Sequence, residues 1–331
     1  MATHLDIAKL TRSVGSLPSP TKALRPSLRI GLVNNMPDGA LMATEQQFSR
    51  LVSQATNDEV SLALYYLPSL SRGEAAQKIL NESYRPINDL YRDGIDALIV
   101  TGNEPRAARL DEEIYWPEMT ALIDWARTNT ASTFWSCLAA HAAVLHLDKV
   151  ERQRLPAKRS GAYTCKSAVG QSALPQSLVI CHSRLNDVPQ AVLEKAGYNI
   201  LSQSIAGDVD VFIKSMPSRF LFLQGHPEYD ALSLAREYRR DVDRFLNRVR
   251  DEYPALPENY FEKATAERYQ NFRNQAEKLR LPTLIENFPA PALRPELARD
   301  MASSAAAIFA FWIDQIKEVA DARANQAMRQ A

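Results

Sequence analysis

Glycine is scarce in this sequence, and its spacing excludes the common phosphate-binding loops. The 331 residues include only 11 glycines, and no two of them lie within two positions of each other. The dinucleotide fingerprint G-x-G-x-x-G is therefore absent, and so is the P-loop pattern G-x-x-x-x-G-K-[ST]. We do not expect a glycine-rich loop to hold phosphate groups in this protein.

Cysteine and net charge are limited as well. The three cysteines, Cys137, Cys165 and Cys181, form no C-x-x-C pair, so neither a disulfide framework nor a metal site is expected. Lysine plus arginine number 39, and so do aspartate plus glutamate, which leaves no net charge. A neutral chain is not expected to bind nucleic acid through bulk charge.

Long apolar runs are missing too. The longest lies near residues 305–313 and is too short to span a bilayer. Residues 1–17 carry several charges and lack the apolar centre of a signal peptide. These features predict a reduced, cytoplasmic protein with no membrane partner.

Strand and helix patterns alternate over residues 28–147. Strands are expected at 28–33, 60–67, 95–100 and 131–136, and helices at 41–55, about 115–128 and 138–147. This alternation is typical of an α/β fold, with a mostly parallel sheet and helices on both faces.

The chain changes character after residue 178. Short apolar runs at 178–181, 199–202, 209–213 and 219–223 predict antiparallel strands appended to the sheet. A helix is expected over 230–248. Residues 251–331 read as helical, with prolines at 282, 289, 291 and 295 marking a linker.

Cys137 is the first candidate for chemistry. It follows the apolar strand 131–136 directly, and a helix begins just after it. The N–H groups and positive end of a helix favour a thiolate and can hold an oxyanion. The alternative is a buried structural cysteine.

His226 and Glu228 are the second candidate. They follow the strand at 219–223, and a spacing of two places both side chains on one side of an extended chain. A carboxylate there can orient the imidazole that a nucleophile needs as its base. The alternative is a turn held by a hydrogen bond. Both candidate segments lie at strand ends, where open α/β sheets place their sites.

Taken together, these segments resemble the homoserine O-acyltransferase (homoserine O-succinyltransferase) family, which belongs to the class I glutamine-amidotransferase-like superfamily. Motifs along residues 28–261 carry the resemblance. They are Leu32-Val33-Asn34-Asn35-Met36-Pro37, Thr44-Glu45 with Gln47, Thr101-Gly102, Tyr115-Trp116, Asp124-Trp125, Cys137, Lys158 with Gly161, His182-Ser183-Arg184, Gly225-His226-Pro227-Glu228-Tyr229-Asp230, Glu237, Arg240-Asp241 and Asn259-Tyr260-Phe261. The combination is specific, although no single motif is.

The resemblance implies a flavodoxin-like fold and a two-step acyl transfer. An acyl-CoA co-substrate would acylate Cys137, and the thioester would pass to the hydroxyl of homoserine or a similar amino acid. His226 resembles the family's base and Glu228 the residue that orients it. The positions that match the amino-acid pocket and its surroundings are Arg240, Glu237, Ser183, Arg184 and Lys158. No bound cofactor is implied, and relatives of this kind form homodimers.

The chain departs from the family pattern at three places, which marks it as a divergent member. The usual Cys-Trp-Gly-Ala-Gln box is here Cys137-Leu138-Ala139-Ala140-His141, and Asp38-Gly39 stands where the family carries two lysines. Arg106 occupies a position where glycine or glutamate is associated with the choice of acyl donor. An arginine there could pair with a dicarboxylic acyl group, which favours succinyl-CoA over acetyl-CoA.

Two other functions stay open at this point. One is an amidotransferase-like amidase or hydrolase that uses the same three residues. The other is a non-catalytic binding protein on this scaffold, suggested by the altered Cys137–His141 box. The basic run 152–159 is either a solvated face or a contact for the CoA phosphates.

The expected organisation has three parts. Residues 1–27 are predicted to form an N-terminal arm, and residues 28–261 the amidotransferase-like acyltransferase domain. Residues 262–331 are predicted to form a helical extension, packed on the domain or at a subunit interface. An apolar stripe that includes Phe309, Trp312 and Ile316 indicates a packing face there rather than a second active site.

Overall fold

The computed structural model describes residues 10–12, 28–168 and 174–330. The predicted arm, residues 1–27, therefore lies outside the described residues, except for a short strand at its centre. The strands of the single sheet are β1 (Leu10–Arg12), β2 (Leu28–Val33), β3 (Val60–Tyr66), β4 (Arg85–Pro86), β5 (Ala97–Val100), β6 (Ser132–Ser136), β7 (Gln153–Ser167), β8 (Ser177–Asp187), β9 (Asn199–Ser204), β10 (Val209–Ser215) and β11 (Arg219–Leu223).

Helices connect most of these strands. They are α1 (Leu41–Ala55), α2 (Glu74–Ser83), α3 (Ile87–Asp93), α4 (Trp116–Asn129), α5 (Leu138–Asp148), α6 (Gln190–Lys195), α7 (Ser233–Leu246), α8 (Lys263–Leu279) and α9 (Leu297–Gln330), with 3-10 turns η2 (Asp38–Ala40), η3 (Leu110–Glu112) and η4 (Pro282–Asn287). The predicted α/β fold is confirmed.

The order of the strands places the two candidate segments side by side. The sheet runs β1-β3-β2-β5-β6-β11-β10-β9-β7-β8, with β4 paired to β3. The pairs from β1 through β6 to β11 are parallel, and those beyond β11 are antiparallel. The prediction that 219–223 is an appended antiparallel strand was wrong for one of its two neighbours. β11 is antiparallel to β10 but parallel to β6, because it is the junction between the two halves of the sheet.

The sheet is covered on both faces, and alternation along each strand decides which side chain meets which helix. In β2, Ile30 and Leu32 belong to a core with side chains of α1 and α9, whereas Val33 faces the core formed with α4 and α5. Phe134 of β6 packs against Phe309 and Trp312 of α9, with ring centroids 5.0 and 5.6 Å apart. The C-terminal stripe predicted from the sequence is therefore part of the main core.

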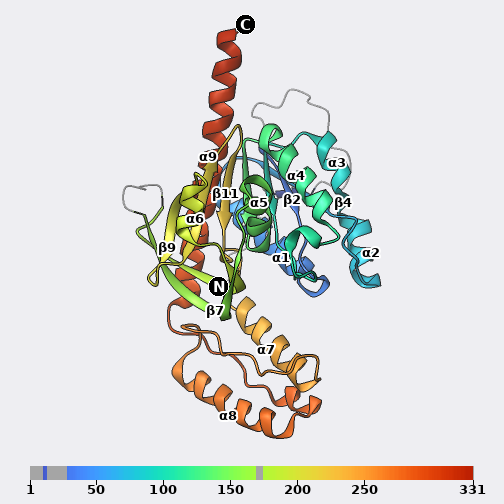
Figure 1. Ribbon diagram of the computed structural model, residues 1–331, viewed down its shortest axis with the longest axis vertical. Coiled ribbons are helices and arrows are strands. Elements are labelled where there is room, and N and C mark those ends of the chain that lie inside the picture. Colours follow the sequence, from blue (N-terminus) through green and yellow to red (C-terminus); the bar gives the residue numbers. More distant parts are fainter. Residues whose placement is uncertain (1–9, 13–27, 169–173, 331) are drawn as a thin grey trace.

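The C-terminal residues form two distinct features in Figure 1. Helices α7 and α8 lie below the sheet, where their aromatic side chains share a core with the segment around Phe288. The long helix α9 then runs along the sheet, and its C-terminal end projects from the body of the protein. Among the described helices, none combines the length and the apolar character that crossing a bilayer requires.

Candidate active site

Cys137 occupies a strained turn between β6 and α5. The strand before it is wholly buried, and the helix begins at the next residue. Its backbone has φ 52° and ψ −112°, a conformation that costs a residue with a Cβ about 1–3 kcal/mol. The Cys137 N–H donates to the Leu223 carbonyl at 2.8 Å, which ties this turn to the end of β11. Such a turn presents a nucleophile at the end of a sheet.

His226 and Glu228 lie beside this turn because β6 and β11 end together. Leu223 is in register with Ser136, so the residues that follow each strand leave the sheet as neighbours. His226 Nδ1 and Glu228 Oε1 are 2.9 Å apart, and both side chains are buried. The His226 N–H donates to the Cys181 carbonyl at 2.7 Å, which holds the histidine backbone in place. The Nδ1 contact leaves Nε2 of the imidazole for Cys137.

The charges around His226 favour its protonated form. Burial alone lowers the pKa of the imidazole, but the Cys137 thiolate and the Glu228 carboxylate together raise it well above its usual value. Hydrogen bonds to Cys137 and Glu228 act in the same direction. Cys137, His226 and Glu228 thus form one coupled unit, suited to hold a thiolate–imidazolium pair and to move a proton.

A second cluster of polar side chains adjoins the histidine. The Tyr229 ring stacks on the His226 ring with centroids 4.3 Å apart, and the Tyr229 hydroxyl donates to Glu237 on α7. Ser183 Oγ donates to the other oxygen of Glu237 at 2.5 Å, and Lys158 Nζ lies 4.0 Å from that same oxygen. The structure therefore brings together three of the predicted substrate-binding residues next to His226.

Arg240 and Lys158 share one carboxylate at the edge of this cluster. Asp241 Oδ2 is 3.1 Å from Lys158 Nζ, and Asp241 Oδ1 is 2.9 Å from Arg240 Nη2. The Arg240 side chain is 45% exposed, so its guanidinium still reaches solvent. A partly exposed guanidinium at this position can donate hydrogen bonds to a second carboxylate, supplied by a small molecule.

Arg184 and Arg106 are placed differently from these residues. Arg184 is buried and donates to Asp187 and to the Asn186 carbonyl, on the opposite side of β8 from Ser183. The Arg106 side chain is exposed, and its backbone N–H donates to Glu113 Oε1 at 2.6 Å. The structure does not bring either side chain into the cluster around Glu237.

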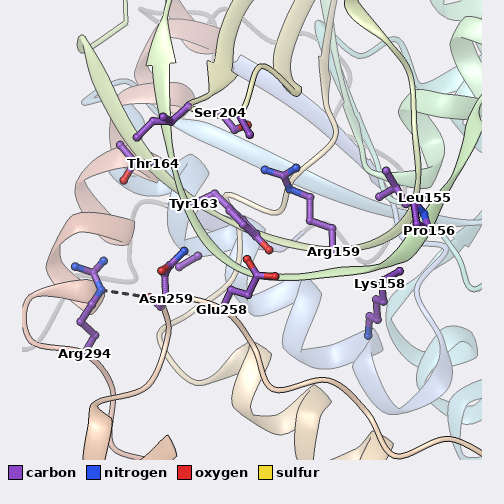
Figure 2. A pocket seen from close by; sticks show the side chains of 14 residues that line it. Leu155, Pro156, Lys158, Arg159, Tyr163, Thr164, Ser204, Glu258, Asn259 and Arg294 are labelled. Atoms are coloured by element: carbon purple, nitrogen blue, oxygen red, sulfur yellow. Dashed lines mark hydrogen bonds between the residues drawn. The ribbon is translucent and has the colours of Figure 1, made fainter.

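A cavity of about 780 Å³ lies against β7, and Lys158 is among the residues that line it. Figure 2 shows these side chains. Two of its cations have partners within the protein: Arg159 pairs with Asp208, and Lys158 shares Asp241 with Arg240. Arg294 Nε donates to the Asn259 carbonyl at 3.2 Å. Because Asp208 compensates its charge, Arg159 offers little free charge for CoA phosphates.

Sequence reasoning missed the contact between Gly102 and the start of α5. A Cβ on Gly102 would lie 2.8 Å from Leu138 Cβ and 2.9 Å from Leu138 N, so only glycine fits there. The loop after β5 thus approaches the first N–H of the helix that follows the nucleophile. The signal was present in Thr101-Gly102 at a strand end, but its partner could not be read from the sequence.

Cys165, His182 and Asp210 form a buried cluster whose ligand atoms lie within 4.8 Å of one another. Arg184 Nε donates to His182 Nδ1 at 3.2 Å, so Nδ1 is an acceptor and Nε2 carries the proton. A protonated Nε2, 3.3 Å from Asp210 Oδ1, is suited to a carboxylate rather than a metal ion. Asp210 Oδ1 also accepts the Gly225 N–H at 3.0 Å, which supports the segment that carries His226.

The comparison with known families agrees with this geometry. The family model for homoserine O-succinyltransferase matches residues 16–320. The chain belongs to the homoserine O-succinyltransferase family. The protein is therefore an acyltransferase, and the family predicted from the motifs is confirmed.

Curated relatives match over most of the chain. A homoserine O-succinyltransferase from Bradyrhizobium japonicum is 48% identical over 296 residues, 88% of this chain and 90% of the relative. One from Methylorubrum extorquens is 42% identical over 320 residues, 96% of this chain and 94% of the relative. Among solved structures, a glutamine amidotransferase from Thermotoga maritima covers 88% of this chain and 99% of its own, with TM-score 0.49 and 11% identity.

His141, where the family usually has glutamine, predicts a measurable pH dependence of stability. Its Nε2 donates to Gln224 Oε1 at 2.8 Å, and its Nδ1 is buried without a partner among the described residues. Burial lowers the pKa of His141 to about 4. The folded state thus binds fewer protons than the unfolded state below about pH 6.5, so stability is lost as the pH falls from there toward 4.

The free energy of unfolding should fall between pH 7 and pH 4.5 in both proteins. We expect the fall to be about 2–3 kcal/mol smaller in His141→Gln than in the wild type. Urea denaturation at both pH values measures the difference. His146→Gln on the same helix is the matched control, because His146 reaches solvent and pairs with Asp124 at 3.0 Å. Equal losses in the wild type and in His141→Gln would show that His141 is already charged in the folded protein.

Proposed function

We propose that the protein transfers the acyl group of succinyl-CoA to the hydroxyl of homoserine, through a thioester on Cys137. The observation that carries the proposal is the coupled Cys137–His226–Glu228 unit at the paired ends of β6 and β11, in a chain of this family. Acyl-CoA enters as a co-substrate, and the mechanism requires no bound cofactor.

In the first half-reaction, His226 holds the proton removed from the Cys137 thiol. The thiolate attacks the thioester carbonyl of succinyl-CoA, and the oxyanion that forms is stabilised by the backbone N–H of Leu138 and by the neighbouring Gly102 backbone. Collapse of this intermediate breaks the bond to CoA, and the imidazolium returns the proton to the departing CoA thiolate. Glu228 keeps the imidazolium oriented and balances its charge.

In the second half-reaction, the acceptor replaces CoA in the same site. His226 takes the proton of the homoserine hydroxyl as that oxygen attacks the Cys137 thioester. The Cys137 thiolate then leaves, and the histidine is again protonated beside it. Splitting the transfer replaces one difficult step with two easier ones.

We assign the acceptor to the cluster beside Tyr229. Glu237 offers a carboxylate for the amino group of homoserine, and the partly exposed Arg240 guanidinium suits its carboxylate. Ser183 and Lys158 position Glu237 and Asp241. Arg184 donates a hydrogen bond to Gln224 and so supports the segment before His226. We assign it no contact with the acceptor. We also propose that the protein is a homodimer in the cytoplasm. This part of the proposal is based on the sequence analysis alone.

Mass spectrometry of the intact protein tests this function. After mixing with succinyl-CoA and no acceptor, we expect the mass of one succinyl group on Cys137, and its loss when homoserine is added. Acylation without transfer to homoserine, together with hydrolysis of glutamine, would favour the amidotransferase-like alternative. No acylation by succinyl-CoA would favour a binding protein on this scaffold.

A further inference from the structure

Among the described residues around the candidate site, one half-buried cation has no hydrogen-bond or ion-pair partner. Lys158 and Arg240 are paired with Asp241, and Arg184 is paired with Asp187. Arg152 makes no hydrogen bond or ion pair with any described residue, although its Nη1 is fully enclosed. A half-buried guanidinium without a carboxylate is costly, so a ligand that supplies one is the physical expectation.

The chain brings Arg152 back toward the nucleophile. After α5 ends, the Val150 N–H donates to the Val144 carbonyl at 3.3 Å, which closes the C-terminal end of the helix that starts at Cys137. Residue 152 is the last one before β7, which is anchored by the pairing of Gln153 with Asp187. Next to Asp187, the Val188 N–H donates to Gln224 Oε1 at 2.9 Å, and His141 of α5 contacts that same oxygen at 2.8 Å, so the start of β7 lies close to the first turn of α5.

Its electrostatic neighbours include the candidate nucleophile, Cys137. Burial lowers the pKa of Arg152, and Tyr115, Glu113 and Cys137 partly offset that effect. Glu113 attracts the guanidinium electrostatically but makes no hydrogen bond to it; its Oε1 accepts two backbone N–H groups, from Arg106 and Ala107, at 2.6 and 2.9 Å. The guanidinium therefore lies close enough to Cys137 to interact with its charge, and no described residue uses its Nη1 donors.

We propose that the Arg152 guanidinium binds the distal carboxylate of the succinyl group, first on succinyl-CoA and then on the Cys137 thioester. This inference rests on the proposed function and names the residue that selects the donor. A guanidinium matches a carboxylate through two parallel hydrogen bonds, and partial burial strengthens the pair relative to water. An acyl group without that carboxylate would leave the guanidinium unpaired, which disfavours acetyl and butyryl donors.

Butyryl-CoA separates this role from its alternatives, because it has the chain length of succinyl-CoA without the carboxylate. We expect Arg152→Met to lower kcat/KM for succinyl-CoA by about 10- to 100-fold and to leave kcat/KM for butyryl-CoA unchanged or higher. Arg152→Lys should recover part of the succinyl preference, because it restores the charge without the bidentate geometry. Arg154→Met is the matched control, since Arg154 is exposed two residues further along and loses the same charge.

The outcomes decide the proposal. An equal loss with both donors in Arg152→Met would overturn it, and would indicate that Arg152 supports the Cys137 thiolate or the fold instead. A donor preference that moves only in Arg106→Gly would also overturn it and would assign selection to Arg106. Wild-type protein that forms no succinyl-enzyme at all would refute the proposed function itself, and the mass measurement detects that separately.

Discussion

Cys137→Ala is expected to abolish both formation of the succinyl-enzyme and transfer to homoserine, while the fold is retained. The thiol is the atom that forms the thioester in the proposed reaction, and no other described cysteine can replace it. Cys165 and Cys181 are buried, and burial raises the pKa of each thiol far above its usual value. Intact mass after mixing with succinyl-CoA and a steady-state transfer assay measure the two losses.

Two further cysteine variants serve as controls for Cys137→Ala. Cys165→Ala removes a thiol from the core and should keep acyl-enzyme formation. Cys137→Gly should be as inactive as Cys137→Ala but about 1 kcal/mol more stable, because glycine tolerates the positive φ of this turn. Residual transfer by Cys137→Ala comparable to the wild type would refute the thioester mechanism.

His226→Ala is expected to reduce kcat/KM by about 10²–10⁴-fold, the usual contribution of a general base. Glu228→Gln should cost less, because the glutamine oxygen can still accept the Nδ1 hydrogen bond and only the charge is lost. The carboxylate helps to raise the pKa of His226, so its removal should also move the alkaline limb of the pH–rate profile to lower pH.

A pH–rate profile of each variant, with circular dichroism to verify folding, measures these effects. Glu237→Gln is a useful comparison, because it alters the acceptor cluster and should raise KM for homoserine without moving the alkaline limb. A negligible effect of His226→Ala would assign the base to another group. His141 would be the first candidate, because its Nδ1 is free of any described partner.

Strand β7 is not predicted by the local sequence pattern. β7 covers Gln153–Ser167, yet this stretch contains Pro156, Gly161 and several cations and shows no clear alternation. It is a strand because it pairs with β8 along most of its length and with β9 at its end. Because β-structure depends on cross-strand partners, the basic run viewed as sequence alone predicts a solvated face or a phosphate contact and not a strand.

The positions of individual site residues were predictable only in part. Alternation along β8 separates Ser183 from Arg184, so only the first reaches Glu237. Both belonged to one motif in the sequence, and the motif does not record which face of the strand each occupies. The sequence did not distinguish Arg152 from the other cations of the basic run. Its partial burial depends on how the chain packs after α5, which no local pattern shows.

The sequence by itself determined the main parallel strands and the helices α1, α4 and α5, but not α2 and α3, and it also determined the family. It placed Cys137 at the end of β6 and the His226–Glu228 pair after β11. These features depend on residues within a few positions of one another, where periodicity and turn chemistry act directly. The tertiary structure alone decided that β11 lies beside β6 in parallel, which brings His226 to Cys137 across a sequence separation of 89 residues. That pairing follows from packing both faces of the whole sheet, and no local pattern encodes such a long-range contact.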